Sequence, residues 1–533
     1  MIKLPSHCQI LIVGAGPSGL MMAAQLLRFG LQPLVVDAKT GINQQSRALA
    51  VQPRSLEIFR QVGLEKRLLE QGNMISGLSA YEDTELLGTV SLDAESGVKS
   101  KFPYVLVLEQ SKTEQILLDY LTAHACPVYW NCELLEIQMK DKGTRVLIRN
   151  REEVQELDCD WLIGADGASS GVRQMLGFNF SGGTYLNRFY LADLTLRREG
   201  PANQIQVFLR SEGFIGVFPM KNDRYRFIGV LPETLEKRKD LSFAEIKPYL
   251  TYTLGFPIQD EVCNWFSVYQ LHHRIADRFR RGTCFLIGDA AHIHSPVGGQ
   301  GMNTGLQDAY NLAWKLAGVI MSEFDRGILN TYQAERLPVA AKLLKTTDRF
   351  FSIAVSRNWL IRRLRGWLLS KVLNWKWKGK AFPAGLFSQI AQTNISYRSS
   401  ALSVHHARPG QVMAGDRLPY LELFDEKKKE KTDLYAWCSK PGFTLLVIGL
   451  FSQRDLYLLA KWIKSTYPAL LNFYYLPPSS ANEHIAAAFN LAKDGKKAVI
   501  VRPDLHIGYM NDVVDIELIE GYLKETVGWR KAG

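Results

Sequence analysis

The sequence predicts an α/β protein in three parts: a domain with a parallel sheet, a mostly antiparallel sheet inserted into it, and a smaller C-terminal α/β domain. Three observations support this fold class. An apolar β run at 9–13 passes through a glycine turn into a helical segment at 20–29. Residues 187–271 alternate between apolar and polar side chains, which is typical of antiparallel strands with one buried face. Further apolar strand segments, at 443–450 and 498–502, follow an irregular stretch at 379–408.

The composition is that of a globular protein with several structural units. The 533 residues are too many for one hydrophobic core, and 47% of them are hydrophobic. The net charge of +11 is largely a local feature, because residues 357–380 hold eight basic side chains and no acidic one. This distribution does not predict a nucleic-acid partner. Residues 357–380 read as a basic amphipathic helix that either packs on the core or makes a peripheral membrane contact, and we favour packing on the core.

The cysteines and histidines give no sign of a metal site or a disulfide framework. The seven cysteines are scattered and none forms a CxxC pair. His292 and His294 lack a third ligand, so a structural role is favoured and no metal is predicted. Unpaired cysteines fit a reducing, cytoplasmic location.

The first element is a strand–turn–helix unit that begins near residue 9. Residues 4–27 carry no Asp, Glu, Lys or Arg and could pass for a signal peptide, but glycines interrupt the run in its middle. Gly14 permits a tight turn, Gly16 lets the backbone approach a pyrophosphate, and Gly19 allows close helix–strand packing. Asp37, at the end of the second strand, is placed to accept a ribose hydroxyl. This pattern predicts a dinucleotide site and leaves FAD and NAD equally open.

Two later segments decide between these cofactors through resemblance to a known family. Residues 164–173, GADGASSGVR, and residues 286–303, LIGDAAHIHSPVGGQGMN, resemble the DG and GD motifs of single-component (class A) FAD-dependent aromatic hydroxylases. Residues 46–48 and 110–114 also resemble segments that contact FAD in that family, and the whole resemblance covers about residues 8–345. It implies that the parallel-sheet domain is a Rossmann-like FAD-binding domain.

The motifs also indicate which residues would hold the cofactor. Asp289 follows a buried strand and would accept hydrogen bonds from the ribityl chain, and residues 298–301 would bring the amides of a helix start beside the isoalloxazine ring. By resemblance, Asp166 would bridge to FAD and assist NAD(P)H binding. The predicted cofactor-binding residues are Gly14, Gly16, Pro17, Ser18, Gly19, Asp37, Ala38, Arg47, Gln110, Asp166, Gly288, Asp289, Pro296, Gly299, Gly301, Met302 and Asn303. Those expected beside the ring, and therefore involved in catalysis, are Pro296, Gly299, Gly301, Met302 and Asn303.

The positions of the motifs set the expected domain boundaries. The tail resembles the thioredoxin-like domain of phenol-hydroxylase-type members, but Cys438 has no partner, so a structural or dimer-forming role is expected. The expected units are an FAD-binding domain at 1–177 and 276–350, a substrate-binding sheet at 178–275 with a contribution from 75–105, a helical connector at 351–400 and a thioredoxin-like domain at 401–533. Strand position alone suggests substrate contacts at Tyr185, Phe214, Phe218 and Gln270.

The resemblance implies a monooxygenase whose partners are a small aromatic molecule and molecular oxygen. In the family, NAD(P)H reduces FAD, and a flavin C4a-hydroperoxide then transfers hydroxyl to a phenolic or polyketide-like ring. No side-chain nucleophile is expected. Two alternatives stay open: another FAD-dependent oxidoreductase of the same superfold, such as an epoxidase, halogenase or reductase, and a flavin-binding protein without turnover.

Overall fold

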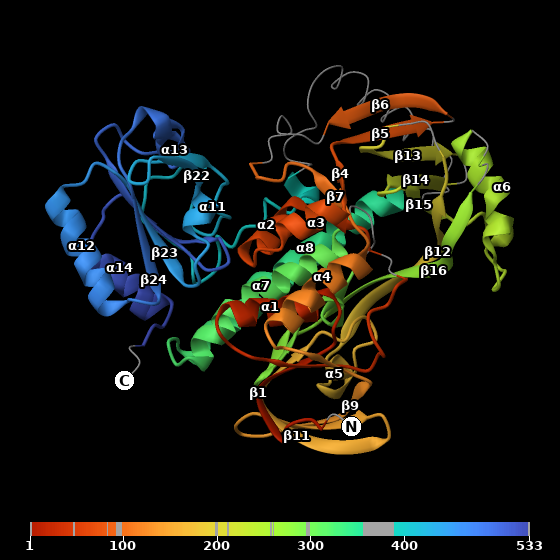
Figure 1. Cartoon of the computed structure of the whole chain (residues 1–533), viewed down its shortest axis with the longest axis horizontal. Helices are drawn as coiled ribbons and strands as arrows, with labels where there is room; N and C mark the ends of the chain where they lie inside the picture. Colours follow the sequence, from red (N-terminus) through yellow and green to blue (C-terminus); the bar gives the residue numbers. More distant parts are fainter. Residues whose placement is uncertain are drawn as a thin grey trace.

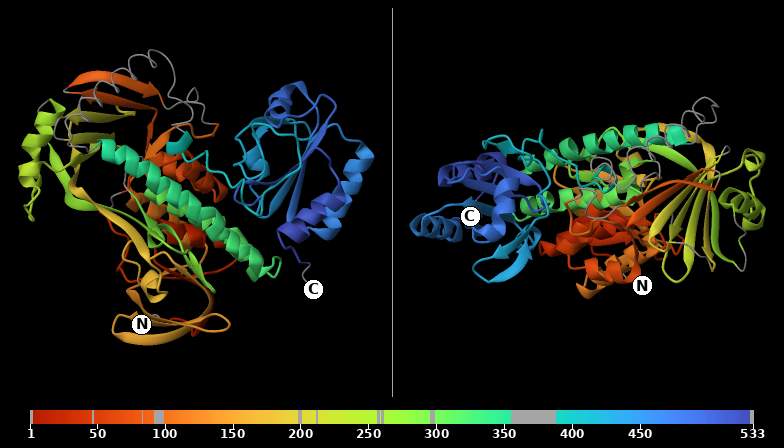
Figure 2. Two further views of the ribbon diagram at one scale, coloured as in Figure 1. Left: turned by 180° about the vertical axis from the view of Figure 1, so that it is seen from behind. Right: turned by 90° about the horizontal axis from the view of Figure 1, so that it is seen from above.

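The chain forms three main sheets with helices packed around them (Figure 1). The part built around the first sheet lies in the middle, and the second sheet and the C-terminal domain lie at opposite ends of the molecule in both further views (Figure 2). The fold class predicted from the sequence, a mixed α/β protein with a Rossmann-like domain, is confirmed. The computed structural model describes residues 3–45, 48–82, 84–91, 99–197, 201–210, 213–255, 258, 261–294, 299–354 and 388–530.

The first sheet has a parallel core in which β1 lies at the centre, between β11 and β2. The apolar ends of β1 and β2 are buried, as expected for strands that are covered on both faces. The parallel strands, in spatial order, are β18 (Cys284–Leu286), β11 (Glu153–Gly164), β1 (His7–Val13), β2 (Leu34–Asp37) and β8 (Val128–Trp130). The antiparallel additions are β17 (Arg280–Arg281), β10 (Thr144–Asn150) and β9 (Cys132–Met139).

Two helices that begin at the carboxyl ends of these strands pack closely together. A Cβ atom at Gly305 would lie 2.2 Å from Oγ of Ser18 and 3.0 Å from Cα of Gly288, so only glycine fits this contact. The close approach brings the N-terminal turns of α1 and α7 together beside Gly288, which follows the carboxyl end of β18. The helices of this domain include α1 (Pro17–Arg28), α2 (Pro53–Gln61), α4 (Gln110–Ala123), α7 (Gly301–Ile320) and α8 (Asn330–Ala354).

The second sheet is antiparallel except where β13 pairs parallel with β5. One face packs against α6 (Phe243–Leu254), with Ile246 against a cluster that includes Tyr190. The opposite face carries the cluster around Phe189 and Tyr269 and is turned toward the first domain. In spatial order the strands are β19 (His292–Ile293), β16 (Val262–Ala276), β12 (Phe180–Thr195), β15 (Arg224–Val230), β14 (Gly213–Pro219), β13 (Gln204–Arg210), β5 (Gly77–Glu82) and β6 (Glu85–Ser91).

The C-terminal domain shares its core with α7. Trp314 of α7 packs edge-on against Phe443, with ring centroids 5.5 Å apart, and both rings meet Phe324 at 6.1 Å. The sheet is mixed, and its thioredoxin-like character stays a prediction. Its strands, in order, are β20 (Val404–His405), β26 (Ile507–Asn511), β25 (Lys496–Val501), β23 (Phe443–Gly449) and β24 (Leu471–Leu476). They are flanked by α12 (Gln453–Thr466), α13 (Glu483–Ala488) and α14 (Ile516–Gly521).

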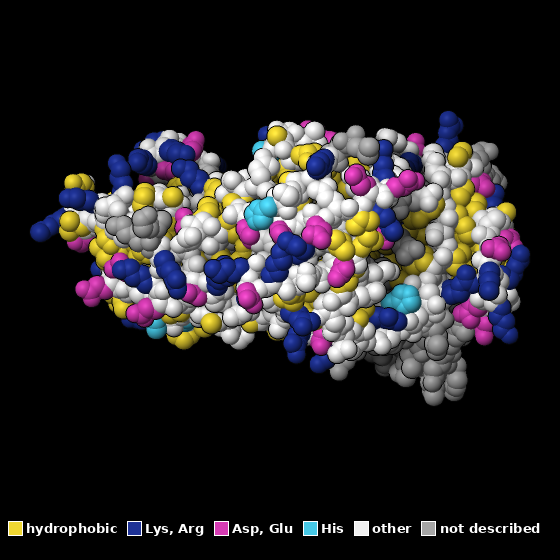
Figure 3. All heavy atoms as spheres, turned by 90° about the horizontal axis from the view of Figure 1, so that it is seen from below, with side chains coloured by type: hydrophobic (Ala, Val, Ile, Leu, Met, Phe, Trp, Pro, Cys, Tyr) yellow, Lys and Arg dark blue, Asp and Glu magenta, His cyan; other side chains and the backbone are white. Residues whose placement is uncertain are grey.

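The distribution of charge bears on possible partners. On the face drawn in Figure 3, Lys and Arg side chains are interspersed with Asp and Glu. The basic segment at 357–380 lies outside the described residues. Among the helices that the structure describes, none is long and apolar enough to cross a membrane.

Candidate functional site

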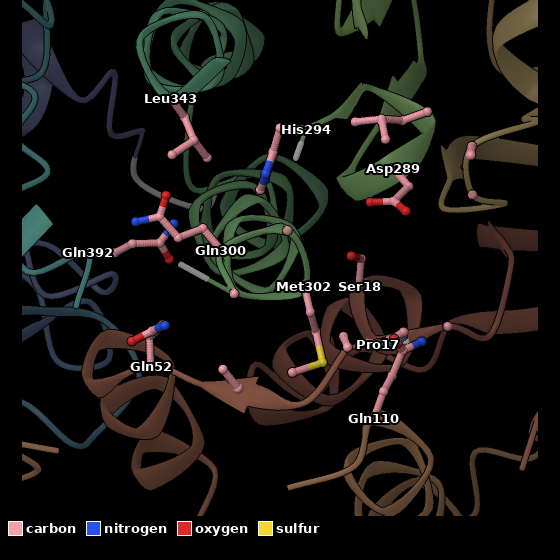
Figure 4. Close-up of a pocket in the computed structure, with 18 of the residues that line it drawn as sticks. Pro17, Ser18, Gln52, Gln110, Asp289, His294, Gln300, Met302, Leu343 and Gln392 are labelled. Carbon is pink, nitrogen blue, oxygen red and sulfur yellow. The ribbon is translucent and has the colours of Figure 1, made fainter. Parts of the chain in front are cut away.

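One large cavity lies where the carboxyl ends of the parallel strands meet the inner face of the second sheet (Figure 4). Its volume is about 1470 Å³. A site for one small molecule typically measures roughly 300–1,000 Å³, so this cavity has room for two ligands. Its walls come from the glycine turn after β1, from the second sheet, and from α8 together with residues 389–400.

The glycine turn is tightly packed on the side that faces the protein and open on the side that faces the cavity. Gly14 has φ +109°, and a Cβ atom there would lie 2.3 Å from the carbonyl oxygen of Ala165. At Gly19 a Cβ atom would lie 1.9 Å from the carbonyl oxygen of Gly14. At Gly16, which faces the cavity, a Cβ atom would meet nothing within 4 Å. No side chain caps the start of α1, so its first amides remain available to an anion.

At the end of the cavity beside β2, Asp37 holds the turn and is itself nearly buried. Its carboxylate accepts hydrogen bonds from the amides of Ala15 at 2.7 Å and Lys39 at 2.8 Å. Gln110, at the start of α4, donates to the buried Glu114 at 2.8 Å. Burial raises the pKa of Glu114. These groups give this end of the cavity the hydrogen-bonding capacity that a ribose requires.

Asp289 presents a carboxylate with no donor to the middle of the cavity. It lies in the short helical turn after β18, and Figure 4 shows it pointing into the space beside Ser18. Within the described structure no hydrogen bond to this carboxylate is found. Enclosure by protein raises its pKa, and the carboxylate of Asp308 adds to the increase, whereas His292 opposes it. The side chain is exposed to the cavity, so its oxygens can accept hydrogen bonds from a ligand that carries hydroxyl groups.

The DG segment is tied to the loop that carries Asp289. Asp166 accepts hydrogen bonds from Oγ of Ser170 at 2.5 Å and from the amide of Val172 at 3.0 Å. Burial raises the pKa of Asp166. Arg173 donates to the carbonyl of Ala290 at 2.9 Å, next to Asp289. Arg173 therefore couples the two motifs that the sequence placed more than a hundred residues apart.

The start of α7 forms the wall of the cavity nearest the second sheet. No side chain caps this helix, so the amides at Gly301 and Met302 remain available. Asn303 is fully buried behind them: its Oδ1 accepts from the amide of Gln52 at 2.9 Å, and its Nδ2 donates to the carbonyl of Gly299 at 2.6 Å. Asn303 thus shapes the loop and does not line the cavity.

The structure brings most of the predicted cofactor-binding residues to this cavity. Those that line it are Gly14, Gly16, Pro17, Ser18, Asp37, Ala38, Gln110, Asp166, Asp289, Gly299, Gly301 and Met302. Those that support it from behind are Gly19, Gly288 and Asn303. Those outside the described residues are Arg47 and Pro296.

Of the predicted substrate contacts, Phe214, Phe218 and Gln270 line the cavity, whereas Tyr185 does not. The pairing of β12 with β16 is irregular between Thr184 and Arg188, so side chains do not alternate regularly between the two faces of the sheet there. Sequence reasoning missed several lining residues that the register of β12 to β16 would have indicated. They are Phe189, Ile205, Val207, Leu209, Ile228, Tyr269, Leu271 and His272.

Several polar side chains from separate segments complete the wall around the α7 start. His294 and Gln300 belong to the motif at 286–303, whereas no motif marks Gln52 and Gln392, which reach this wall only through the tertiary fold. Figure 4 shows four of them, and they are Gln52, His294, Gln300 and Gln392. Among the described residues no group of three or more His, Cys, Asp or Glu could hold a metal ion.

Comparison with known proteins identifies the family. The model of the "FAD binding domain" family matches residues 7–347, which is more than half of the chain. The chain belongs to this FAD-binding family. The flavoprotein is 35% identical to 6-methylpretetramide 4-monooxygenase of Streptomyces rimosus over 66% of this chain and 63% of that protein. It is 31% identical to pentachlorophenol 4-monooxygenase of Sphingobium chlorophenolicum over 78% and 76%.

A solved structure agrees over the whole length. The anhydrotetracycline hydroxylase of Streptomyces rimosus superimposes with a TM-score of 0.77 at 26% identity, covering 98% of this chain and 99% of that one. The flavoprotein is thus an FAD-dependent oxidoreductase of the aromatic monooxygenase type. Its own cavity fits FAD: Gly16 leaves open space beside an uncapped helix, and Asp289 offers an unpaired acceptor between the two ends.

Proposed function

We propose that this flavoenzyme hydroxylates an uncharged, extended aromatic ring system, with NAD(P)H as reductant and molecular oxygen as co-substrate. The observation that carries the proposal is the lining that the second sheet gives to the cavity. It is apolar and aromatic, with Gln270 and His272 as polar groups, and it contains no Lys, Arg, Asp or Glu among the described residues. A carboxylate substrate would find no counter-charge there, and burying an unpaired charge is costly.

The size of the site and the known relatives support a ring system larger than one phenol. The cavity exceeds the volume of a single-ligand site, so a sizeable space remains beside the cofactor. Two of the relatives carry names that refer to tetracycline-type compounds, and one name refers to a chlorinated phenol. Apolar walls from Phe189, Phe214 and Tyr269 would hold such rings by burial and edge or face contacts.

The protein's contribution is to bind, orient and exclude water. When bound, reduced FAD supplies the electrons that activate oxygen for transfer to the ring. The uncapped start of α7 places the amides of Gly301 and Met302 where they would stabilise negative charge on the ring system of the cofactor. The second sheet would hold the substrate ring against that end of the cavity and keep water out.

A substrate screen tests this proposal. We expect a hydroxyanthraquinone to stimulate NADPH oxidation by the FAD-loaded protein and to gain one oxygen atom by mass. We expect 4-hydroxybenzoate to give no stimulation, because the wall formed by the second sheet offers its carboxylate no positively charged side chain among the described residues. Stimulation by 4-hydroxybenzoate alone would contradict the proposal. NADPH consumption with every phenol but without oxygen incorporation would favour a reductase or oxidase instead.

Replacing Phe218 with alanine tests the substrate wall. Phe218 lines the cavity, and losing its burial against a bound ring costs about 1.5–3 kcal/mol, which is roughly ten- to a hundredfold in kcat/KM. FAD affinity should not change, because Phe218 belongs to the second sheet. The control is Tyr252→Ala on the outer helix α6, where the side chain is 69% exposed and kcat/KM should stay the same. Equal effects of the two changes would place the substrate elsewhere.

We also propose a cytoplasmic location, which the seven unpaired cysteines support. A homodimer formed through the C-terminal domain and a membrane contact through 357–380 stay open as proposals. Size-exclusion elution and vesicle sedimentation of the full chain would test them.

A further inference from the structure

The C-terminal domain meets the FAD-binding domain through a buried cluster of charged side chains. Glu335 of α8 lies at its centre and accepts hydrogen bonds from both terminal nitrogens of Arg502, at 2.7 and 2.9 Å. It also accepts one from Nζ of Lys315 at 2.7 Å, while Arg502 reaches Asp504 at 2.6 Å. These four residues are at most 4% exposed. Because buried charges are tolerated only when they are paired, the cluster holds α8 in one position against the C-terminal domain.

The next residue of α8, Arg336, links this interface to the cofactor loop. Its Nε donates to Oδ1 of Asp308 at 2.6 Å, and its NH1 donates to the hydroxyl of Tyr397 at 3.0 Å. The ring of Tyr397 in turn lies against His506 of the C-terminal domain, with ring centroids 4.4 Å apart. Arg336 and Asp308 are both fully buried. Arg336 therefore joins a ring held by the C-terminal domain to a carboxylate behind the cofactor loop.

Asp308 contacts a backbone amide before Asp289 and a side chain after it. Its Oδ2 accepts the amide of Gly288 at 3.1 Å and lies 2.8 Å from Nε2 of His292. Burial alone would raise the pKa of Asp308, but the charges of Arg336 and His292 outweigh burial and hold it below its ordinary value. The carboxylate thus stays ionised and able to accept all three hydrogen bonds. Asp289 is presented to the cavity by a loop that is anchored at both flanks.

We propose that the C-terminal domain sets the affinity of the flavin site, with Tyr397, Arg336 and Asp308 acting as positioning residues for Asp289. A group that binds a ligand must be held within about 0.5 Å of its working geometry. Loosening α8 moves Arg336, the ion-pair partner of Asp308 on α7, and the Asp289 loop then loses part of its anchor. The rival interpretation is that the buried charges only stabilise the fold. The binding measurements use FAD, FMN and ADP without any substrate, so their outcome does not depend on the substrate proposed above.

A matched pair of tyrosine changes separates the two interpretations. Tyr397→Phe removes the acceptor of the NH1 group of Arg336 but keeps the ring against His506. Tyr310→Phe removes a buried hydroxyl that donates to Pro503 at 3.0 Å across the same interface, without contact to the loop. The affinities of the apoprotein for FAD, FMN and ADP are measured for both, together with Tm. FMN carries the ribityl chain that Asp289 would bind, whereas ADP carries only the half that the glycine turn would bind.

We expect Tyr397→Phe to weaken FAD and FMN binding by roughly two- to tenfold, the effect of one hydrogen bond, with ADP affinity unchanged. Tyr310→Phe should lower Tm about as much as Tyr397→Phe does, and it should leave the affinities for FAD, FMN and ADP unchanged. Equal losses of FMN affinity in the two variants, or a lower Tm of Tyr397→Phe with unchanged FMN affinity, would overturn the proposal.

Asp308→Asn provides a second measurement on the same path. It removes the charge that Arg336 and His292 share, so FMN affinity should fall further than in Tyr397→Phe. Combined with Tyr397→Phe, it should bind FMN no more weakly than Asp308→Asn alone, because both changes interrupt one route. Fully additive losses would show separate effects and contradict the proposal. If Asp308→Asn does not fold, the tyrosine pair decides the question.

Discussion

Gly16→Ala is expected to weaken FAD binding strongly in a protein whose apo form remains folded. Gly16 has φ −82° and ψ −177°, which alanine adopts readily, and the added methyl group would meet no atom within 4 Å. The same open space lies in front of the uncapped start of α1, where the pyrophosphate must approach the backbone. Forcing a methyl group into that contact costs about 1–3 kcal/mol, or roughly five- to a hundredfold in affinity. Flavin titration of the apoprotein and its thermal melting measure the two effects.

Two other glycines serve as controls for this change. Gly521, at the end of α14, also has open space around its Cβ position but lies in the C-terminal domain, so Gly521→Ala should leave FAD affinity unchanged. Gly19→Ala places a methyl group 1.9 Å from the carbonyl oxygen of Gly14, so the apoprotein itself should lose stability. If Gly16→Ala bound FAD as tightly as the wild type, the pyrophosphate would not lie at this turn.

The parts of the fold that the sequence predicts well are those whose signals are local. The apolar run before Gly14 and the glycine turn together define β1 and α1, and the structure has both. The helix start that the sequence places beside residues 298–301 lies at Gly301, and no side chain caps it. Alternation in 187–271 predicts antiparallel strands, but it does not predict the parallel pairing of β5 with β13, since β5 comes from a distant part of the chain.

Residues of the candidate site could be predicted from the sequence where only one residue type can do what the position requires. Glycines at a close backbone approach and an acid at a strand end can be identified from spacing. Asn303 could not be assigned in this way, because an amide can bind a cofactor or brace a loop equally well, and here it braces the loop. The wall from residues 389–400 and the pairing of Glu335 with Arg502 join segments far apart in sequence, and no local pattern indicates such contacts.

Asp289→Ala is expected to weaken FAD binding without lowering the stability of the apoprotein. The ribityl hydroxyls would lose a charged acceptor, which costs about 1.5–3 kcal/mol, or roughly ten- to a hundredfold in FAD affinity. In the apoprotein the carboxylate is exposed to the open cavity, and no donor reaches it among the described residues, although the surrounding protein raises its pKa. Removing it should therefore not lower the Tm of the apoprotein. Flavin titration and thermal melting without flavin give the two readings on one sample.

The pH dependence of the apoprotein distinguishes this role from that of a structural turn acid. An acid whose pKa is raised in the folded state binds protons more tightly folded than unfolded, so stability falls as pH rises from the ordinary Asp value, about 3.9, through the raised one. Asp289→Asn keeps the size and removes the titration, so the decline that Asp289 causes should disappear while FAD binding stays weaker than in the wild type. A turn acid would behave in the opposite way: its replacement would lower the Tm of the apoprotein at neutral pH and leave FAD affinity unchanged. A lower Tm of the apoprotein would therefore show that this carboxylate supports the fold, whereas an unchanged or higher Tm together with weaker FAD binding would show that it meets the cofactor.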